Sequence, residues 1–166
     1  METLVLEDNK LSGPVPTELG RLSRLAKLSL QNNSLLSRAI PSELGSLTQL
    51  TELELDRTSL SGSIPLQLWS LSELKILSLH SSDLAPQTLP SQIGRLVHME
   101  EVELQDTPLM GPVPTEIGLV SSSLQLLDFQ NTRLTGSVPK ALCGVPALQF
   151  NCSQTLCGCD CPCASR

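Results

Sequence analysis

The sequence predicts an α/β solenoid, a stack of similar coils that each contain a short strand and a helical turn. Leucine accounts for 35 of the 166 residues, whereas the chain has two Phe, one Trp and no Tyr, which indicates a uniform aliphatic core. Leucines also recur at the same offsets upstream of six prolines, which are themselves spaced 24 or 25 residues apart. Such a period is typical of repeat architectures. The prolines are Pro16, Pro41, Pro65, Pro90, Pro114 and Pro139.

The strand of each repeat is predicted by a leucine at every second position. The second copy, Leu25-Ala-Lys-Leu28-Ser-Leu30, is the clearest. A period of two buries one face of a strand, and a single strand of this length cannot cover its own leucines. Stacking the copies about 4.8 Å apart gives a parallel sheet over a continuous core. The predicted copies are 1–24, 25–49, 50–73, 74–98, 99–123 and 124–147.

A polar column follows the strands, where the chain turns away from the sheet. Asn9 and Asn33 begin this column, and an inward amide there can satisfy backbone groups along the stack. The later copies carry a hydroxyl, which performs part of the same role. These residues are Thr58, Ser82, Thr107 and Thr132.

The rest of each coil contains a tight turn, an extended step and a helical turn. Glycine marks the tight turn in four copies, and one-residue insertions near residues 38 and 87 predict local bulges in the other two. The step before proline favours extended backbone. Residues 18–20 and their equivalents then leave room only for a helical turn or a 3₁₀ segment. The turn glycines are Gly13, Gly62, Gly111 and Gly136.

These copies resemble the leucine-rich repeat, L-x-x-L-x-L-x-x-N-x-L. The continuation Leu11-Ser-Gly-Pro-Val-Pro-Thr-Glu-Leu19-Gly-Arg-Leu22 is similar to the plant-type subclass, L-x-G-x-I-P-x-x-L-G-x-L, and residues 60–71 match with Trp69 at the second glycine position. The resemblance covers roughly 90% of the chain. It implies a right-handed superhelix with strands on a concave face and helical turns on a convex face. It also implies a protein or peptide ligand, as in receptor-like kinase ectodomains and polygalacturonase inhibitors.

The two ends of the chain differ from the repeats. Met1 falls at the first leucine position of a copy, without the Cys-containing N-terminal cap usual in this subclass, so we expect a chain truncated at its N-terminus. Residues 148–166 are expected to form a Cys-rich cap or tail, and the resemblance implies a disulfide between Cys143 and Cys152. The C-x-C spacing of residues 157–163 also suits a thiolate cluster with Zn or Cu(I). The six cysteines are Cys143, Cys152, Cys157, Cys159, Cys161 and Cys163.

The outward side chains of the predicted sheet supply the candidate binding surface. The register defines four columns, beginning at Thr3, Val5, Glu7 and Asp8, which together hold nine of the 17 acidic residues and two cations. Like charges on neighbouring strands are mildly unfavourable, so this one-sided sign favours a site for a cationic or hydroxyl-rich partner. The candidate residues are Glu7, Lys27, Glu52, Glu54, Asp56, Arg57, His80, Glu101, Glu103 and Asp128.

Several function classes are disfavoured. A net charge of −6 and a pI near 4.8 argue against binding to nucleic acid or anionic lipid, and no stretch is apolar enough to span a membrane.

Paired carboxylates raise the question of glycoside hydrolysis, but an open, hydrated sheet has no pocket to raise the pKa of an acid. His80 and His98 are predicted to be solvated, although His80 could lie beside Asp56. A calcium site at Glu54, Asp56 and Glu103 lacks an Asp-rich loop, so we predict no metal, no cofactor and no enzymatic activity.

The sequence therefore predicts non-catalytic recognition by the concave face. A secreted inhibitor of a cell-wall hydrolase and a structural or adhesion role, including ice binding, are the alternatives. Asn32 and Asn151 begin glycosylation sequons, in agreement with an extracellular or cell-surface location.

Overall fold

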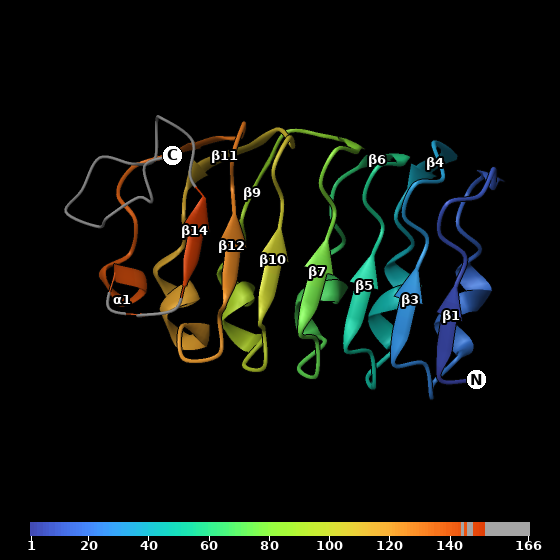
Figure 1. The fold of residues 1–166 in the computed structure, drawn as a ribbon, viewed down its shortest axis with the longest axis horizontal. Coiled ribbons are helices and arrows are strands. Elements are labelled where there is room, and N and C mark those ends of the chain that lie inside the picture. The colour runs from blue at the N-terminus through green and yellow to red at the C-terminus, as the bar shows by residue number, and fades with distance from the viewer. Residues whose placement is uncertain (144, 146–147, 152–166) are drawn as a thin grey trace.

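The computed structural model describes residues 1–143, 145 and 148–151 as a stack of coils around one parallel sheet (Figure 1). The first six strands of this sheet are the predicted ones, which confirms the solenoid. The seventh, β14, lies in the segment 148–166, where the sequence analysis predicted a cap and no strand. In spatial order the strands are β1 (Thr3–Val5), β3 (Lys27–Ser29), β5 (Glu52–Glu54), β7 (Ile76–Ser78), β10 (Glu101–Glu103), β12 (Leu126–Asp128) and β14 (Gln149–Asn151).

The register of the sheet stacks equivalent leucines of successive coils. Leu28 pairs with Leu4 on one side and with Leu53 on the other, and the same offset continues through Leu77 to Val102. Leu28 and Leu53 are 0% exposed, and the buried aliphatic residues form one continuous cluster along the stack. Burial of this column is what holds one coil to the next, since no single coil could cover it alone.

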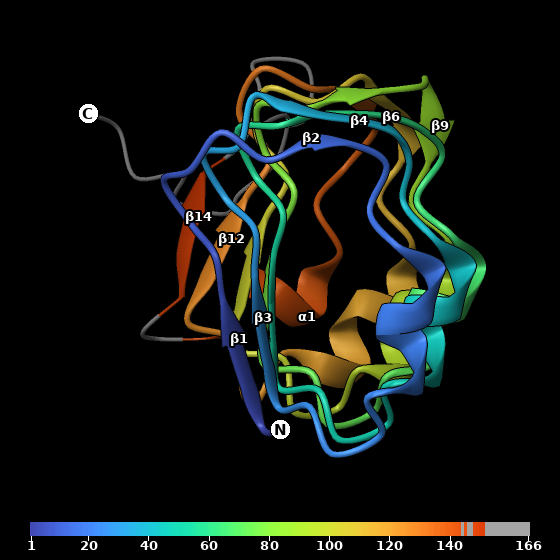
Figure 2. The same cartoon turned by 90° about the vertical axis from the view of Figure 1, so that its right-hand side faces the viewer.

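Short helices cover the side of each coil opposite the sheet (Figure 2). Each 3₁₀ helix starts directly after the predicted proline, whose extended backbone ends the preceding segment. A Cβ added at Gly45 would overlap Gln67 of the next coil, so glycine lets these helices approach closely. Trp69 takes the equivalent position and is 2% exposed. The helices are η1 (Thr17–Arg21), η2 (Ser42–Ser46), η3 (Leu66–Ser70), η4 (Ser91–Arg95), η5 (Thr115–Val120) and α1 (Lys140–Cys143).

Two further parallel sheets, not predicted from the sequence, join the concave strands to the helices. Their order is β2-β4-β6-β8 and β13-β11-β9. The break between them falls at the insertion near residue 87, while Arg38 at the other insertion adopts a positive φ of 73°. Neither insertion interrupts the main sheet. The strands are β2 (Ser12–Gly13), β4 (Leu35–Ala39), β6 (Ser59–Gly62), β8 (Asp83–Leu84), β9 (Gln87–Thr88), β11 (Leu109–Pro112) and β13 (Arg133–Thr135).

The polar column behaves as predicted where it carries an internal asparagine. The Asn33 amide is 0% exposed and donates to the carbonyls of Leu6 in the preceding coil and Leu30 in its own, each at 2.9 Å. Its Oδ1 accepts from the backbone N–H of Leu11 at 3.0 Å. Among the main-chain groups of the described residues, the Thr58 hydroxyl donates only to the Leu55 carbonyl of its own coil, at 2.8 Å. Asparagine therefore joins two coils through the backbone, whereas threonine closes one.

At the C-terminal end, Cys143 is disulfide-bonded. The predicted partner Cys152 and the run Cys157–Cys163 lie outside the described residues, as do the alternatives of disulfide and metal thiolate for that run. No helix within the described part of the chain is long and apolar enough to cross a membrane.

Candidate functional site

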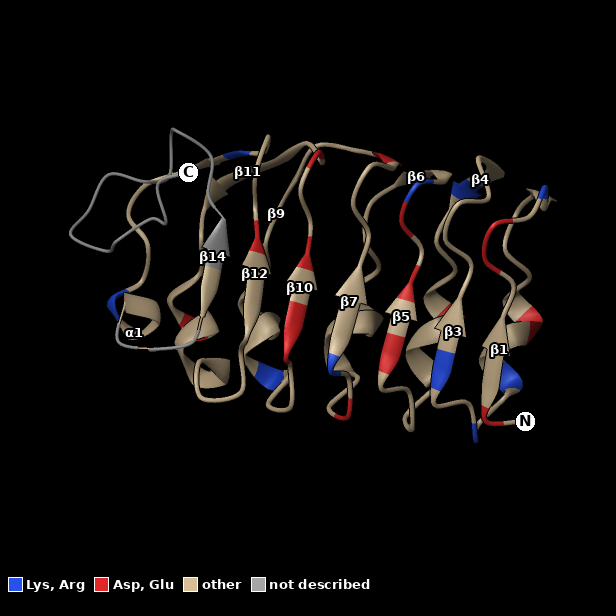
Figure 3. Ribbon diagram, viewed as in Figure 1, with Lys and Arg blue, Asp and Glu red and all other residues tan. Residues whose placement is uncertain are grey.

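The predicted columns lie on the outward face of the main sheet, here called the concave face. The cross-strand register places Glu52, Ile76 and Glu101 side by side in one row, and Glu54, Ser78 and Glu103 in the next. Acidic segments on β5 and β10 therefore flank the uncharged β7, and the basic Lys27 segment on β3 borders β5 (Figure 3). Sequence reasoning placed these residues on neighbouring strands, and the structure shows how their charges are distributed.

Lys27 balances the acidic residues of β5. Its Nζ lies 2.6 Å from Glu52 Oε2 and 3.3 Å from Glu54 Oε2. The hydrogen bond to Glu52, followed by the charge of Glu54, raises the pKa of Lys27 against the opposing effect of burial. This half of the concave face is therefore closer to neutral than its sequence suggests.

Glu7, at the N-terminal end of the face, is also bound internally. Its carboxylate accepts from Gln31 Nε2 at 2.8 Å and from Ser29 Oγ at 3.2 Å. The Gln31 bond, and then the Ser29 bond, lower the pKa of Glu7. At the other end, Asp128 is 9% exposed and accepts from the backbone N–H of Gln130 at 2.9 Å. Both predicted site residues thus have structural partners.

His80 differs from the prediction of a solvated histidine, because it is only 9% exposed. Its Nε2 lies 3.3 Å from Asp56 Oδ2, and Asp56 is itself 3% exposed. In the middle of the third outward column, where the strands end, the flanking coils cover Asp56 and His80, whereas Gln130 at the end of the column is exposed. The predicted proximity of His80 to Asp56 is confirmed, while His98 is exposed as predicted.

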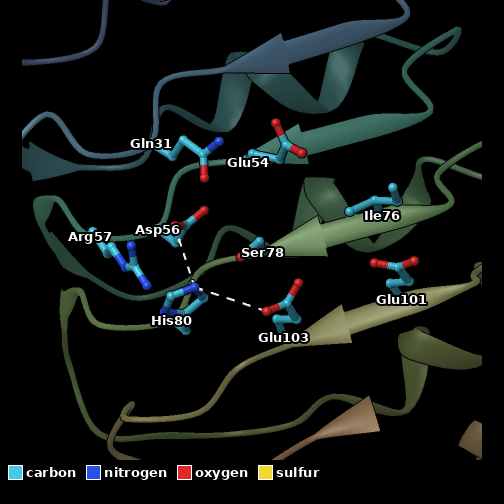
Figure 4. A pocket seen from close by; sticks show the side chains of 9 residues that line it. All are labelled: Gln31, Glu54, Asp56, Arg57, Ile76, Ser78, His80, Glu101 and Glu103. Carbon is cyan, nitrogen blue, oxygen red and sulfur yellow. Dashed lines mark ion pairs between the residues drawn. The ribbon is translucent and has the colours of Figure 1, made fainter. Parts of the chain in front are cut away.

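A hollow of about 190 Å³ lies at the centre of the concave face, where the sequence predicted an open sheet without a pocket. Ser78 is the reason, because this small side chain on β7 stands between Glu54 on β5 and Glu103 on β10. Figure 4 shows the carboxylates of both glutamates around the gap, with His80 at one end. The lining residues are Gln31, Glu54, Asp56, Arg57, Ile76, Ser78, His80, Glu101 and Glu103.

The β10 side of the hollow carries the least compensated negative charge. Glu103 Oε2 lies 4.0 Å from His80 Nε2, and no ion pair within the described residues involves Glu101. Burial raises the pKa of Glu101, and the neighbouring carboxylates, Glu103 first, raise it further. A bound cation would relieve both the desolvation and the repulsion. This part of the face is thus suited to binding a cationic group.

The fourth column has a backbone property that the sequence analysis missed. All six of its residues adopt a left-handed conformation, with φ between 52° and 56°. Four of them are Asn or Asp, which tolerate this region best among residues other than glycine, so aligning the copies could have revealed it. Asn32, the candidate glycosylation residue, donates from its amide to Asp8 Oδ1 at 2.9 Å. The column is Asp8, Asn32, Arg57, Ser81, Asp106 and Asn131.

The candidate calcium ligands are not gathered into a metal site. Within the part of the chain that the structure describes, no group of three or more His, Cys, Asp or Glu residues could hold a metal ion. Glu54 and Glu103 stand on opposite sides of β7 instead of converging on one point.

Comparison with protein families agrees with the repeat pattern. The Leucine Rich Repeat family model matches residues 1–22, 24–47 and 123–145. None of the curated proteins compared with this chain matches it.

Solved structures with the same fold include plant receptor ectodomains. The LRR ectodomain of the plant membrane receptor kinase GASSHO1/SCHENGEN3 from Arabidopsis thaliana, in complex with CASPARIAN STRIP INTEGRITY FACTOR 2, is 34% identical over 90% of this chain, with a TM-score of 0.84. The plant peptide hormone receptor RGFR1 in complex with RGF2 is 29% identical over 92%, also at 0.84. A plant ice-binding protein is 30% identical over 90%, at 0.81. This chain spans 18%, 24% and 49% of their respective lengths.

Proposed function

We propose that this chain, a leucine-rich-repeat protein of the plant type, binds a protein or peptide partner along its concave face and catalyses no reaction. The observation that carries the proposal is the hollow between β5 and β10, where Glu101 and Glu103 lack a strong cationic partner among the described residues. The partner would therefore present a cationic or polar surface.

The dimensions of the face favour an extended peptide. Seven parallel strands spaced about 4.8 Å apart form a surface roughly 30 Å long, which matches about nine residues of extended chain. Every strand adds another set of outward side chains, so a peptide lying across the strands would meet a new set at each step. The receptor RGFR1, whose fold this chain shares, is described as a peptide hormone receptor.

An extracellular or cell-surface location is part of the same proposal. Cys143 is disulfide-bonded, and disulfides persist in oxidising compartments. The GASSHO1/SCHENGEN3 structure is the ectodomain of a plant membrane receptor kinase. Glycosylation at Asn32 would place a sugar on the rim of the concave face. The side chain of Asn151, the other candidate glycosylation residue, lies outside the part of the chain that the structure describes.

Ice binding is the second candidate, favoured by the likeness to a plant ice-binding protein. The predicted hydroxyl column does not support it, because Thr58 and Thr107 are 5% and 2% exposed and donate inwards. A freezing-hysteresis measurement on the purified chain separates the two functions. A secreted inhibitor would instead bind a cell-wall hydrolase through the same face.

Selection from a displayed library of random peptides tests the proposal. We expect the full chain to enrich peptides whose binding weakens with salt and falls roughly tenfold or more in a variant carrying Glu54→Gln, Glu101→Gln and Glu103→Gln. The matched control neutralises three exposed glutamates of the convex helices, Glu18, Glu43 and Glu116, and should bind as the wild type does. Equal binding by the concave variant would refute the proposed surface.

A further inference from the structure

The geometry points to an arginine side chain as the group that anchors the partner. We define the notch as Glu54, Ser78 and Glu103, with Ile76 and Glu101 beside them. The inference rests on the proposed function for the partner being a peptide, and it names the side chain that the central hollow recognises.

The width of the notch is set by the sheet. Glu54 pairs with Ser78, which pairs with Glu103, so two strand spacings of roughly 4.8 Å each separate the two glutamate backbones. Two long carboxylates therefore face each other across one small residue. A planar guanidinium fits between them and can donate to both sides, because its five N–H groups form a rigid fork.

The floor of the notch supplies an observation independent of the acidic charge. Ser78 is only 4% exposed and lines the hollow (Figure 4). Its hydroxyl makes no hydrogen bond with any of the described residues, although the equivalent Ser29 hydroxyl on β3 donates to Glu7. The hydroxyl opens into the hollow, so its hydrogen-bonding capacity is available to a ligand there. An N–H donor entering the notch would give it a partner.

The charges around the notch favour a single cation. Glu54 already pairs with Lys27 at 3.3 Å. Glu103 accepts a hydrogen bond from Gln105 Nε2 at 3.4 Å, but its only ion-pair partner among the described residues is His80, at 4.0 Å. Burial and the neighbouring carboxylates raise the pKa of Glu101, so an added positive charge stabilises its ionised form. Ile76, half-buried on β7, offers an apolar wall for the methylene stem of the ligand. Arg57, beyond His80, disfavours a second cation at that end.

Arginine fits these features better than a metal ion or lysine. Glu54 and Glu103 approach from opposite sides of β7, and the residues that the structure describes hold no metal-binding group of three. A lysine ammonium is a point charge that reaches one side of the notch at a time, whereas guanidinium bridges both.

Methyl NMR of the full chain provides the test. The five isoleucines include Ile76 in the notch, and the other four, Ile40, Ile64, Ile93 and Ile117, are at most 4% exposed in the core. Titration with acetyl-Gly-Gly-Arg-Gly-Gly-amide should shift the Ile76 δ1-methyl signal saturably and leave the other four in place. The citrulline and lysine versions of this peptide should bind roughly tenfold more weakly or worse.

Two variants separate the notch from general charge attraction. Ser78→Leu fills the notch without changing any charge and should abolish the saturable shift, while Ser78→Ala keeps the space, removes the hydroxyl and should weaken binding a few-fold. Unchanged signals of the four core isoleucines show that each variant is folded. Equal affinity for the arginine and citrulline peptides, or saturable binding by Ser78→Leu, would overturn the inference.

The outcome also distinguishes this inference from the proposed function. Selected peptides that lack arginine but still depend on Glu54, Glu101 and Glu103 would refute the arginine notch and support the concave binding surface. Loss of that dependence would refute the proposed function itself.

Discussion

Replacing Asn33 by alanine tests how adjacent coils are joined. The Asn33 side chain is 0% exposed, donates to the Leu6 and Leu30 carbonyls and accepts from the Leu11 N–H. Leu6 O keeps a second donor, Asn9 Nδ2 at 3.2 Å, and Gln31 O, which also accepts from the Asn33 amide at 3.2 Å, keeps the Asp8 N–H. The Leu30 carbonyl and the Leu11 N–H lose their side-chain partner. At about 1–3 kcal/mol for each unsatisfied buried group, and with some water entering the site, Asn33→Ala should lower the free energy of unfolding by about 2–4 kcal/mol.

The assay is urea unfolding followed both by far-UV circular dichroism and by fluorescence of the single Trp69, which lies 2% exposed in a neighbouring part of the stack. Agreement of the two probes would show that the coils unfold together. A loss of this size is a large share of the 5–15 kcal/mol typical of a domain. We therefore expect a clear fall in the urea midpoint.

Two controls make the reasoning refutable. Asn9→Ala removes an exposed amide whose hydrogen bonds within the described residues go to carbonyls of its own coil, those of Leu6 and Glu7, so its effect should stay within about 0.5 kcal/mol. Asn33→Thr keeps a hydroxyl for the Leu30 carbonyl, as Thr58 does for Leu55, but leaves the Leu11 N–H unpaired, so its cost should be intermediate. If Asn33→Ala unfolds at the wild-type midpoint, or Asn33→Thr is neutral, the link between coils is not carried by this amide.

Two further predictions concern local strain and charge. Arg38, in β4, has a φ of 73° where other copies place a glycine with positive φ, so Arg38→Gly should raise stability by up to about 1 kcal/mol. Gly62→Ala, at φ 76°, should lower stability by a similar amount. Thermal unfolding that moves both variants the same way would contradict this. Because burial raises the pKa of Glu101, ionisation opposes folding, and Glu101→Gln should be more stable than the wild type at pH 7. That advantage should shrink as the pH falls through the raised pKa and Glu101 protonates, so urea midpoints whose difference is as large at pH 4 as at pH 7 would refute the assignment.

The repeat period by itself determined the architecture. Leucines at every second position recur every 24 or 25 residues. They can be buried only if the coils stack, because each strand needs the next one to cover it. The pairing of Leu28 with Leu4 and Leu53 follows directly from that spacing. The same register predicted which side chains face outwards, including the proximity of His80 to Asp56, because periodicity is a property of each copy and its immediate neighbours.

Only the tertiary structure decided how deep those outward residues lie and which of them remain free. The hollow exists because Ser78 is a small side chain between Glu54 and Glu103. His80 is buried because side chains of the adjacent coils pack against it. Both features depend on the sizes of side chains on several strands. Ion pairing likewise depends on the reach of individual side chains, and Lys27 forms its ion pairs with glutamates of β5 rather than β10. Burial and electrostatic compensation are properties of the assembled surface. The sequence pattern therefore predicted an acidic face, but it could not predict the hollow between β5 and β10.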